Sequence, residues 1–135
     1  MVKAVCLDTR ILSAYLKGKE SAQQIIDDFK NKGYEIYTTT INITEFFMGL
    51  YKANVLSEEK LKSLKEFFYT LHPRTIDYEI SVLAGRLNAT VLKGQEIGWR
   101  DLFIAAITLL NGRTIITDNL EHFKRIPDLV SIEYY

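Results

Sequence analysis

The amino-acid sequence predicts a three-layer α/β/α fold built around a mainly parallel sheet. Short apolar runs typical of buried strands alternate along the chain with longer segments of helical periodicity. The segment 101–110 is apolar apart from Asp101 and Thr108, which is the composition of a helix buried against a sheet. Alternation of this kind favours parallel strands joined by crossover helices.

The composition indicates one globular domain covering residues 1–135, with 47% hydrophobic and 25% charged residues. Seventeen basic residues balance seventeen acidic ones, so any nucleic-acid binding must come from a local patch rather than from net charge. The single cysteine, Cys6, excludes an intramolecular disulfide, and no apolar run reaches the length of a membrane span. We therefore expect a cytoplasmic protein without membrane association.

The first half of the chain has two apolar strand patterns, and each is followed closely by an acid. Asp8 comes directly after the first run, and Glu45 lies early in the helix that follows the second. Glycines that follow the helical patterns mark their ends. The expected elements are a strand at 3–7, helices at 11–17 and 21–31, a strand at 36–40 and a helix at 41–53.

The second half begins with an amphipathic helix that Ser57 caps and Pro73 stops. Asn111 and Gly112 then connect the buried helix to a β-branched strand. The expected elements are a helix at 57–71, a short strand at 74–77, a helix at 78–93, a loop at 94–98, a helix opened by Asp101, a strand at 114–117, a helical turn at 120–123 and an edge strand at 130–132.

Topology predicts that four acids, Asp8, Glu45, Asp101 and Asp118, meet at one edge of the sheet, with Asn119 beside them. A helix that leads into a parallel strand begins at the edge where that strand ends, and ligands bind at this edge in open α/β sheets. In isolation each acid is also explained as a helix cap, a turn residue or a half-exposed helix residue. One shared site explains all four more economically.

A cluster of oxygen ligands indicates a hard cation, Mg²⁺ or Mn²⁺. Neither histidine, His72 or His122, has metal-ligand spacing, and we expect His122 and Phe123 to pack against the sheet. A metal of this kind activates water and neutralises charge on a phosphoryl group, so phosphodiester hydrolysis is the predicted reaction.

Four stretches of the chain, LDTRILSAYL, TEFFMGL, GWRDLFIAAITLLNG and TIITDNLEHFKRIPDL, resemble the PIN-domain ribonucleases, and closely the VapC-type toxins of toxin–antitoxin pairs. The resemblance covers nearly the whole chain. It implies a PIN fold, an Mg²⁺- or Mn²⁺-dependent endoribonuclease, a homodimer, and a cognate antitoxin that occupies the active-site groove. The amphipathic helix 57–71 is a candidate to help form that groove, although core packing explains most of its apolar stripe.

Carried over by position, the resemblance assigns catalytic and metal-binding roles to Asp8, Glu45 and Asp101. The fourth position of the family falls on Asn119, whereas Asp118 precedes it, so either residue can be the fourth ligand. The number of metals, one or two, also stays open.

The candidates for RNA contact are Arg10, Arg100, Thr117 and Lys124, because all four flank the acids in the sequence. Trp99 can stack on a base, but a packed surface aromatic is the simpler interpretation.

Two other functions compete with the nuclease. In an aspartate-dependent phosphohydrolase Asp8 would be the nucleophile, but such enzymes need a second acid two residues on, where this chain has Arg10. The other is a catalytically idle PIN-like module that binds RNA or a partner, and the neutral amide of Asn119 favours it.

Overall fold

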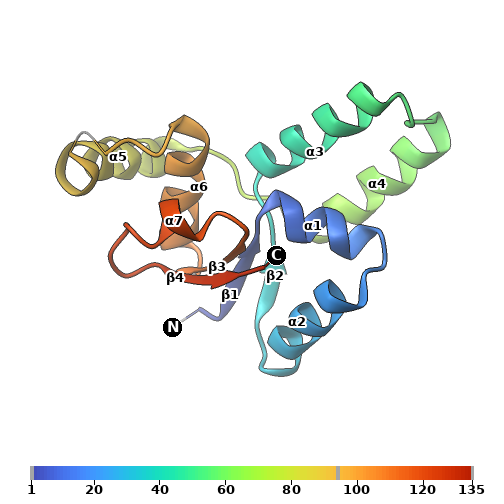
Figure 1. Ribbon diagram of the computed structural model, residues 1–135, viewed down its shortest axis with the longest axis horizontal. Helices are drawn as coiled ribbons and strands as arrows, with labels where there is room; N and C mark the ends of the chain where they lie inside the picture. Colours follow the sequence, from blue (N-terminus) through green and yellow to red (C-terminus); the bar gives the residue numbers. More distant parts are fainter. Residues whose placement is uncertain (1, 94, 135) are drawn as a thin grey trace.

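The computed structural model describes residues 2–93 and 95–134, which form a parallel four-stranded sheet between two layers of helices (Figure 1). The strands are β1 (Ala4–Leu7), β2 (Glu35–Tyr37), β3 (Thr114–Thr117) and β4 (Val130–Glu133), and their order in the sheet is β2-β1-β3-β4. All three strand pairs are parallel, with Cys6 of β1 opposite Tyr37 and Ile115. The predicted parallel sheet and the edge position of the last strand are confirmed.

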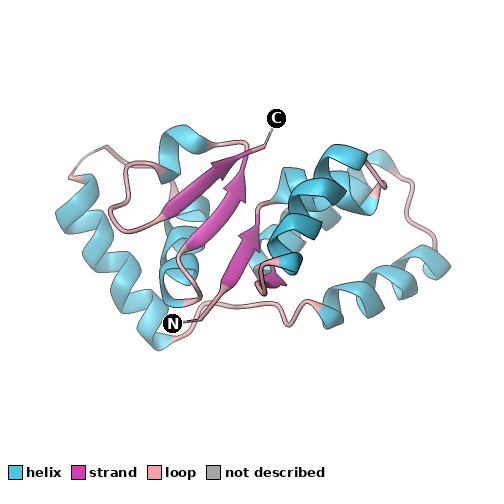
Figure 2. Ribbon diagram, turned by 90° about the horizontal axis from the view of Figure 1, so that it is seen from below, coloured by secondary structure: helices cyan, strands magenta, loops and turns pink. Residues whose placement is uncertain are grey.

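The helices divide between the two faces of the sheet (Figure 2). One face carries α5 (Tyr78–Leu87), α6 (Trp99–Leu110) and α7 (Leu120–Phe123), and the other carries α1 (Thr9–Leu16), α2 (Glu20–Asn31), α3 (Thr40–Ala53) and α4 (Glu58–Thr70). Strand residues alternate accordingly: Ala4 and Cys6 pack with the first group, and Val5 and Leu7 with the second. The three-layer prediction is confirmed.

The helices α3 and α4 run side by side away from the sheet and are joined by aromatic side chains (Figure 1). Phe68 of α4 contacts Phe46 and Phe47 of α3, with ring centroids 5.4 and 5.8 Å apart. Leu64 and Phe68 of α4 are buried, which confirms that its apolar stripe serves the core. None of the helices within the described ranges is both long and apolar enough to cross a membrane.

Three predicted elements differ from the structure. The strand predicted over 36–40 ends at Tyr37, because Thr39 caps α3 and Thr40 begins that helix. The stretch 74–77 forms no strand; Arg74 makes only an isolated parallel bridge to Thr39. The helix predicted over 78–93 ends as an α-helix at Leu87 and continues as a π-helical turn, η1 (Asn88–Leu92). In that turn the Thr90 hydroxyl donates to the Arg86 carbonyl at 2.7 Å, so side chain and backbone compete for one acceptor. The predicted loop at 94–98 includes Gly94, which lies outside the described residues.

The connection from α6 to β3 approaches β1 very closely at Gly112. Its φ of +95° is a left-handed conformation that favours glycine, and a Cβ there would lie 2.4 Å from the Ala4 carbonyl oxygen. This close contact sets β3 directly beside β1. The polar residues that follow both strands therefore emerge at one edge of the sheet.

Candidate active site

Three carboxylates from distant parts of the chain meet at the C-terminal edge of the sheet. Asp8 follows β1 and is 1% exposed, and Asp101 lies in the first turn of α6 and is 4% exposed. Glu45 reaches the same place from α3, with 42% of its side chain exposed. The expected meeting of these acids therefore takes place, with two of them buried and one at the mouth of the site.

One arginine links all three acids. The Arg100 guanidinium donates from Nε to Oε2 of Glu45 at 2.6 Å and from Nη2 to Oε1 at 2.9 Å. Its Nη2 also donates to Oδ1 of Asp8 at 2.7 Å, and its Nη1 donates to Oδ1 of Asp101. The sequence suggested Arg100 as a phosphate contact, but in this structure its side chain turns inward and binds the acids.

Asp8 is held by neutral donors as well as by that arginine. Its Oδ1 accepts from the Thr9 backbone N–H and from the Asn42 amide, each at 2.8 Å, and its Oδ2 accepts from the Thr117 hydroxyl at 2.6 Å. Asn42 is completely buried, and its amide oxygen accepts from the Thr39 hydroxyl at 2.7 Å. Thr117 is equally buried, so its hydroxyl orients the carboxylate and is not exposed for contact with RNA.

Asp101 has two further partners on the segment that follows β3. Its Oδ2 lies 2.8 Å from the Asn119 amide nitrogen and 2.6 Å from Nδ1 of His122. His122 was expected to pack against the sheet; only its neighbour Phe123 enters the core, because the short helix α7 turns the imidazole toward the acids. That expectation was wrong for His122.

Asp118 lies apart from this group. Its carboxylate faces Arg10, with Oδ2 3.7 Å from Nη1, and the side chains of Arg10 and Asp118 are 62% and 40% exposed. Asn119 is the residue that contacts Asp101, through its side chain, and its backbone N–H donates to the Thr117 hydroxyl at 2.9 Å. Of the two candidates for the fourth position, the amide is therefore nearer to the buried acids.

The electrostatics of the site follow from this arrangement. Burial alone would lower the pKa of Arg100, but the hydrogen bond that it donates to Glu45 and the charges of Asp8 and Asp101 outweigh burial and raise that pKa. Partial burial would raise the pKa of Glu45, but hydrogen bonds, chiefly from Arg100, hold it below its ordinary value. Three carboxylates and one guanidinium leave an excess of two negative charges, which favours binding of a further cation.

The donor set suits a hard divalent cation, because the atoms that converge from Asp8, Glu45 and Asp101 are carboxylate oxygens and no thiolate is among them. Within residues 2–93 and 95–134, however, no group of three or more acidic, histidine or cysteine side chains is spaced to hold a metal. In this structure the Arg100 guanidinium lies among the three carboxylates and donates to each of them. The residues fit a metal by their chemistry once that guanidinium is withdrawn.

A cleft of about 410 Å³ opens beside the acids and has a basic rim. Besides Glu45 and Arg100 it is lined by Arg10 and by two lysines that the sequence did not suggest, Lys17 and Lys19. These lysines follow α1 and become neighbours of the site only through the fold. The rim supplies positive charge at the place where a nucleic acid would approach.

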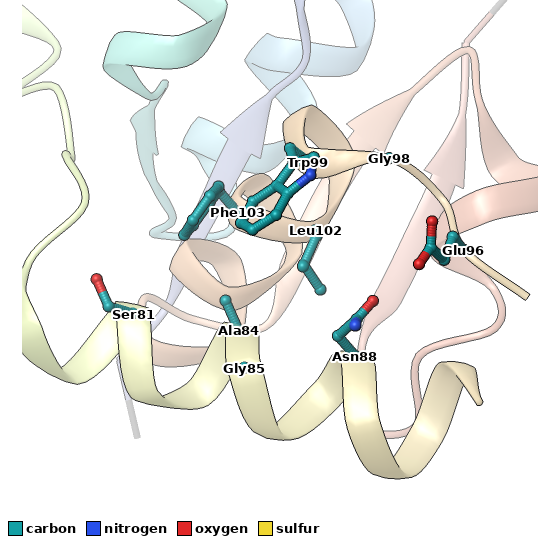
Figure 3. Close-up of a pocket in the computed structure, with 9 residues that line it drawn as sticks. All are labelled: Ser81, Ala84, Gly85, Asn88, Glu96, Gly98, Trp99, Leu102 and Phe103. Carbon is teal, nitrogen blue, oxygen red and sulfur yellow. The ribbon is translucent and has the colours of Figure 1, made fainter. Parts of the chain in front are cut away.

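The side chains of Lys124 and Trp99 contact residues other than the acids of the site. Lys124 pairs with Glu121 of its own helical turn, with 2.6 Å between Nζ and Oε1. Trp99 is 77% exposed, its ring centroid lies 5.7 Å from that of Phe103, and the two line a separate pocket of about 380 Å³ between α5 and α6 (Figure 3). Asp8, Glu45 and Asp101 do not line this pocket.

Solved toxin–antitoxin structures have the same fold. The chain aligns with VapBC2 from Rickettsia felis, bound to a DNA fragment from its promoter, with a TM-score of 0.77 and 26% identity over 98% of this chain and 99% of that one. For a DNA-bound VapBC from Salmonella typhimurium the TM-score is 0.77 at 24% identity, with 98% of each chain covered.

Curated relatives are ribonucleases. The chain is 27% identical to ribonuclease VapC19 of Mycobacterium tuberculosis, covering 91% of this chain and 94% of the relative, and 29% identical to ribonuclease VapC1 of Rickettsia felis, covering 91% and 90%. It is 26% identical to the tRNA(fMet)-specific endonuclease VapC of Salmonella typhimurium, covering 91% and 92%. The family model of the PIN domain matches residues 5–129, and with this match over almost its whole length the chain belongs to the PIN domain family.

Proposed function

We propose that this protein is an endoribonuclease and the toxin of a toxin–antitoxin pair, and that its activity depends on Mg²⁺ or Mn²⁺. The observation that carries the proposal is the convergence of Asp8, Glu45 and Asp101 on one point at the sheet edge. The ribonuclease relatives and the VapBC structures support the reaction and the toxin role.

In the proposed reaction Asp8 and Asp101 would hold the metal, and Glu45, at the solvent side, would orient the attacking water. When bound, the metal lowers the pKa of that water and neutralises charge on the phosphodiester. Asn42 and Thr117 keep the Asp8 carboxylate in place by hydrogen bonding, so its oxygens need no rearrangement during the reaction. No histidine base and no covalent nucleophile are required.

For the fourth position we propose Asn119, with Asp118 in a peripheral role. The Asn119 side chain touches Asp101, whereas Asp118 faces Arg10 at the rim. His122 then acts as a positioning residue, because its Nδ1 shares the Oδ2 oxygen of Asp101 with that amide.

The RNA backbone would enter by the basic cleft, where Arg10, Lys17 and Lys19 can meet its phosphates. Next to this cleft, a second one of about 480 Å³ lies among α1, α3 and α4, with Phe46, Leu50 and Val55 on its walls. We propose that the antitoxin binds there, since both clefts are lined by Glu45 and a bound segment would cover the acids.

The site of action would be the cytoplasm, and the expected homodimer can be checked by light scattering.

The test is cleavage of RNA by the purified, antitoxin-free protein in Mg²⁺, Mn²⁺ or EDTA, beside Asp101→Asn. We expect metal-dependent cutting that Asp101→Asn abolishes while cooperative melting persists. Asp27→Asn, on the exposed surface of α2, is the matched control and should cut normally. A loss of both activity and cooperative melting in Asp101→Asn would instead assign that acid a structural role.

One observation favours a second candidate, the catalytically idle module: the guanidinium of Arg100 occupies the centre of the site. That candidate predicts RNA binding without metal-dependent turnover in the same assay. The phosphohydrolase gains no support, because the Asp8 carboxylate is buried and each of its oxygens accepts a hydrogen bond.

A further inference from the structure

The Arg100 side chain uses all three guanidinium nitrogens on the acids of the proposed metal site. Nε and Nη2 donate to both oxygens of Glu45, Nη2 also reaches Asp8, and Nη1 reaches Asp101. Nη2 is further placed 3.2 Å from the Thr9 hydroxyl. A guanidinium therefore lies where carboxylate oxygens from three segments of the chain converge.

The Oδ2 atoms of Asp8 and Asp101 already accept from Thr117 and Asn119, so a divalent cation bound by these acids would compete with Arg100 for the Oδ1 atoms and for Glu45. The guanidinium and the metal cannot share them, because both are positive and both require direct contact with the carboxylates. Arg100 has room to withdraw, since its side chain is 33% exposed and lines the 410 Å³ cleft. An arginine on a long flexible stem can leave the acids without any change in the fold.

We propose, on the basis of the metal-dependent function above, that Arg100 is a built-in occupant of the metal site which the incoming divalent cation must displace. The apo site is then held together by its own cation, and metal binding selects the state in which Arg100 points into the cleft. In that state the guanidinium stands at the basic rim with Lys17 and Lys19, where it can bind an RNA phosphate.

Because metal binds only to molecules in which Arg100 has withdrawn, the apparent affinity for metal equals the intrinsic affinity multiplied by the fraction of such molecules. If that fraction is about 1–10%, removal of the guanidinium strengthens metal binding by about tenfold to a hundredfold. The same substitution removes the counter-charge of three carboxylates, so the apo protein should melt at a lower temperature and gain more from added metal.

The experiment measures Mn²⁺ binding to the purified protein by electron paramagnetic resonance, with thermal melting in parallel, for wild type, Arg100→Gln and Arg86→Gln. Arg86 is an exposed arginine near the end of α5, so its replacement makes the same change in net charge away from the acids. We expect Arg100→Gln to bind Mn²⁺ at least tenfold more tightly than wild type, and Arg86→Gln to match wild type.

Equal Mn²⁺ affinity in wild type and Arg100→Gln would overturn the inference and leave the metal-dependent function standing. Weaker binding in Arg100→Gln would also overturn it, by showing that the arginine helps to assemble the site. An absence of Mn²⁺ binding in both proteins would overturn the metal-dependent function together with the inference. If Arg100→Gln does not fold, Arg100→Lys keeps the charge without the planar fork, and its Mn²⁺ affinity should exceed that of wild type.

Discussion

The hydroxyl of Thr117 joins Asp8, the first acid of the site, to the segment that carries Asn119, the proposed fourth ligand, and Thr117→Val tests its role. Its Oγ1 donates to Asp8 at 2.6 Å and accepts from the Asn119 backbone N–H at 2.9 Å, in a fully buried position. Valine has nearly the same shape as threonine but no hydroxyl, so both hydrogen bonds are lost while no large cavity forms. A hydrogen bond to a charged group contributes about 1.5–3 kcal/mol, and the neutral, part-buried hydrogen bond from the Asn119 N–H about 0.5–1 kcal/mol.

We therefore expect Thr117→Val to lower the free energy of unfolding by about 2–4 kcal/mol. For a chain of this size the fall in Tm is about 8–16 °C. Urea unfolding followed by circular dichroism gives the free energy, and a calorimetric scan gives Tm. RNA cleavage should weaken as well, because the carboxylate of Asp8 loses a donor that orients it.

Thr108→Val is the matched control. Thr108 is equally buried, but its hydroxyl donates to the neutral Ile104 carbonyl of the same helix at 2.8 Å. Its loss should cost no more than about 1 kcal/mol. If the two variants lose the same stability, the Thr117 hydroxyl makes no special contribution through the charge of Asp8, and the reasoning is refuted.

Three further predictions concern the turn, the thiol and the fourth ligand. Gly112→Ala should lower the free energy of unfolding by about 3–5 kcal/mol in a denaturation experiment, because its Cβ would meet the backbone of β1. Gly85→Ala, with open space around its helical position, should be neutral or slightly stabilising. Similar effects of the two substitutions would contradict the close approach at Gly112. Burial raises the pKa of the Cys6 thiol above its ordinary 9.0, so its contribution to stability is complete below pH 9.0 and falls as the pH rises further. Iodoacetamide labelling at about pH 8.5 should accordingly follow global unfolding, and rapid labelling of the native protein would contradict this. Asn119→Ala should weaken Mn²⁺ binding by about tenfold and Asp118→Ala much less, as measured by calorimetry; the reverse order would move the fourth ligand to Asp118.

Much of the fold could be predicted from local patterns. The apolar run that ends at Leu7 and the β-branched run 114–117 could only be buried strands, and the helix between Asp101 and Leu110 was recognisable from its composition. The stretch 74–77 was mistaken for a strand because its residues suit an extended backbone, and only the pairing with Thr39 shows that a single bridge forms there.

The site could be predicted as a group of acids but not as a network. Parallel topology brings Asp8 and Asp101 to one edge whatever their rotamers, so their proximity followed from strand order alone. The direction of a long side chain does not follow from topology, and Arg100 turned inward although its place in the sequence suited a phosphate contact equally well. The roles of Asn42 and His122 depend on tertiary contacts over 34 and 21 positions, for which the sequence carries no local signal.

The distribution of the site along the chain has a consequence for synthesis. The first acid is Asp8 and the last contact of the network comes from His122, so the ribosome must translate through residue 122 before the network can close. The central strand β1 also lacks one of its two neighbours until β3 has been made. A chain that stops before β3 therefore lacks both a neighbour of β1 and the Thr117 hydroxyl that holds the Asp8 carboxylate.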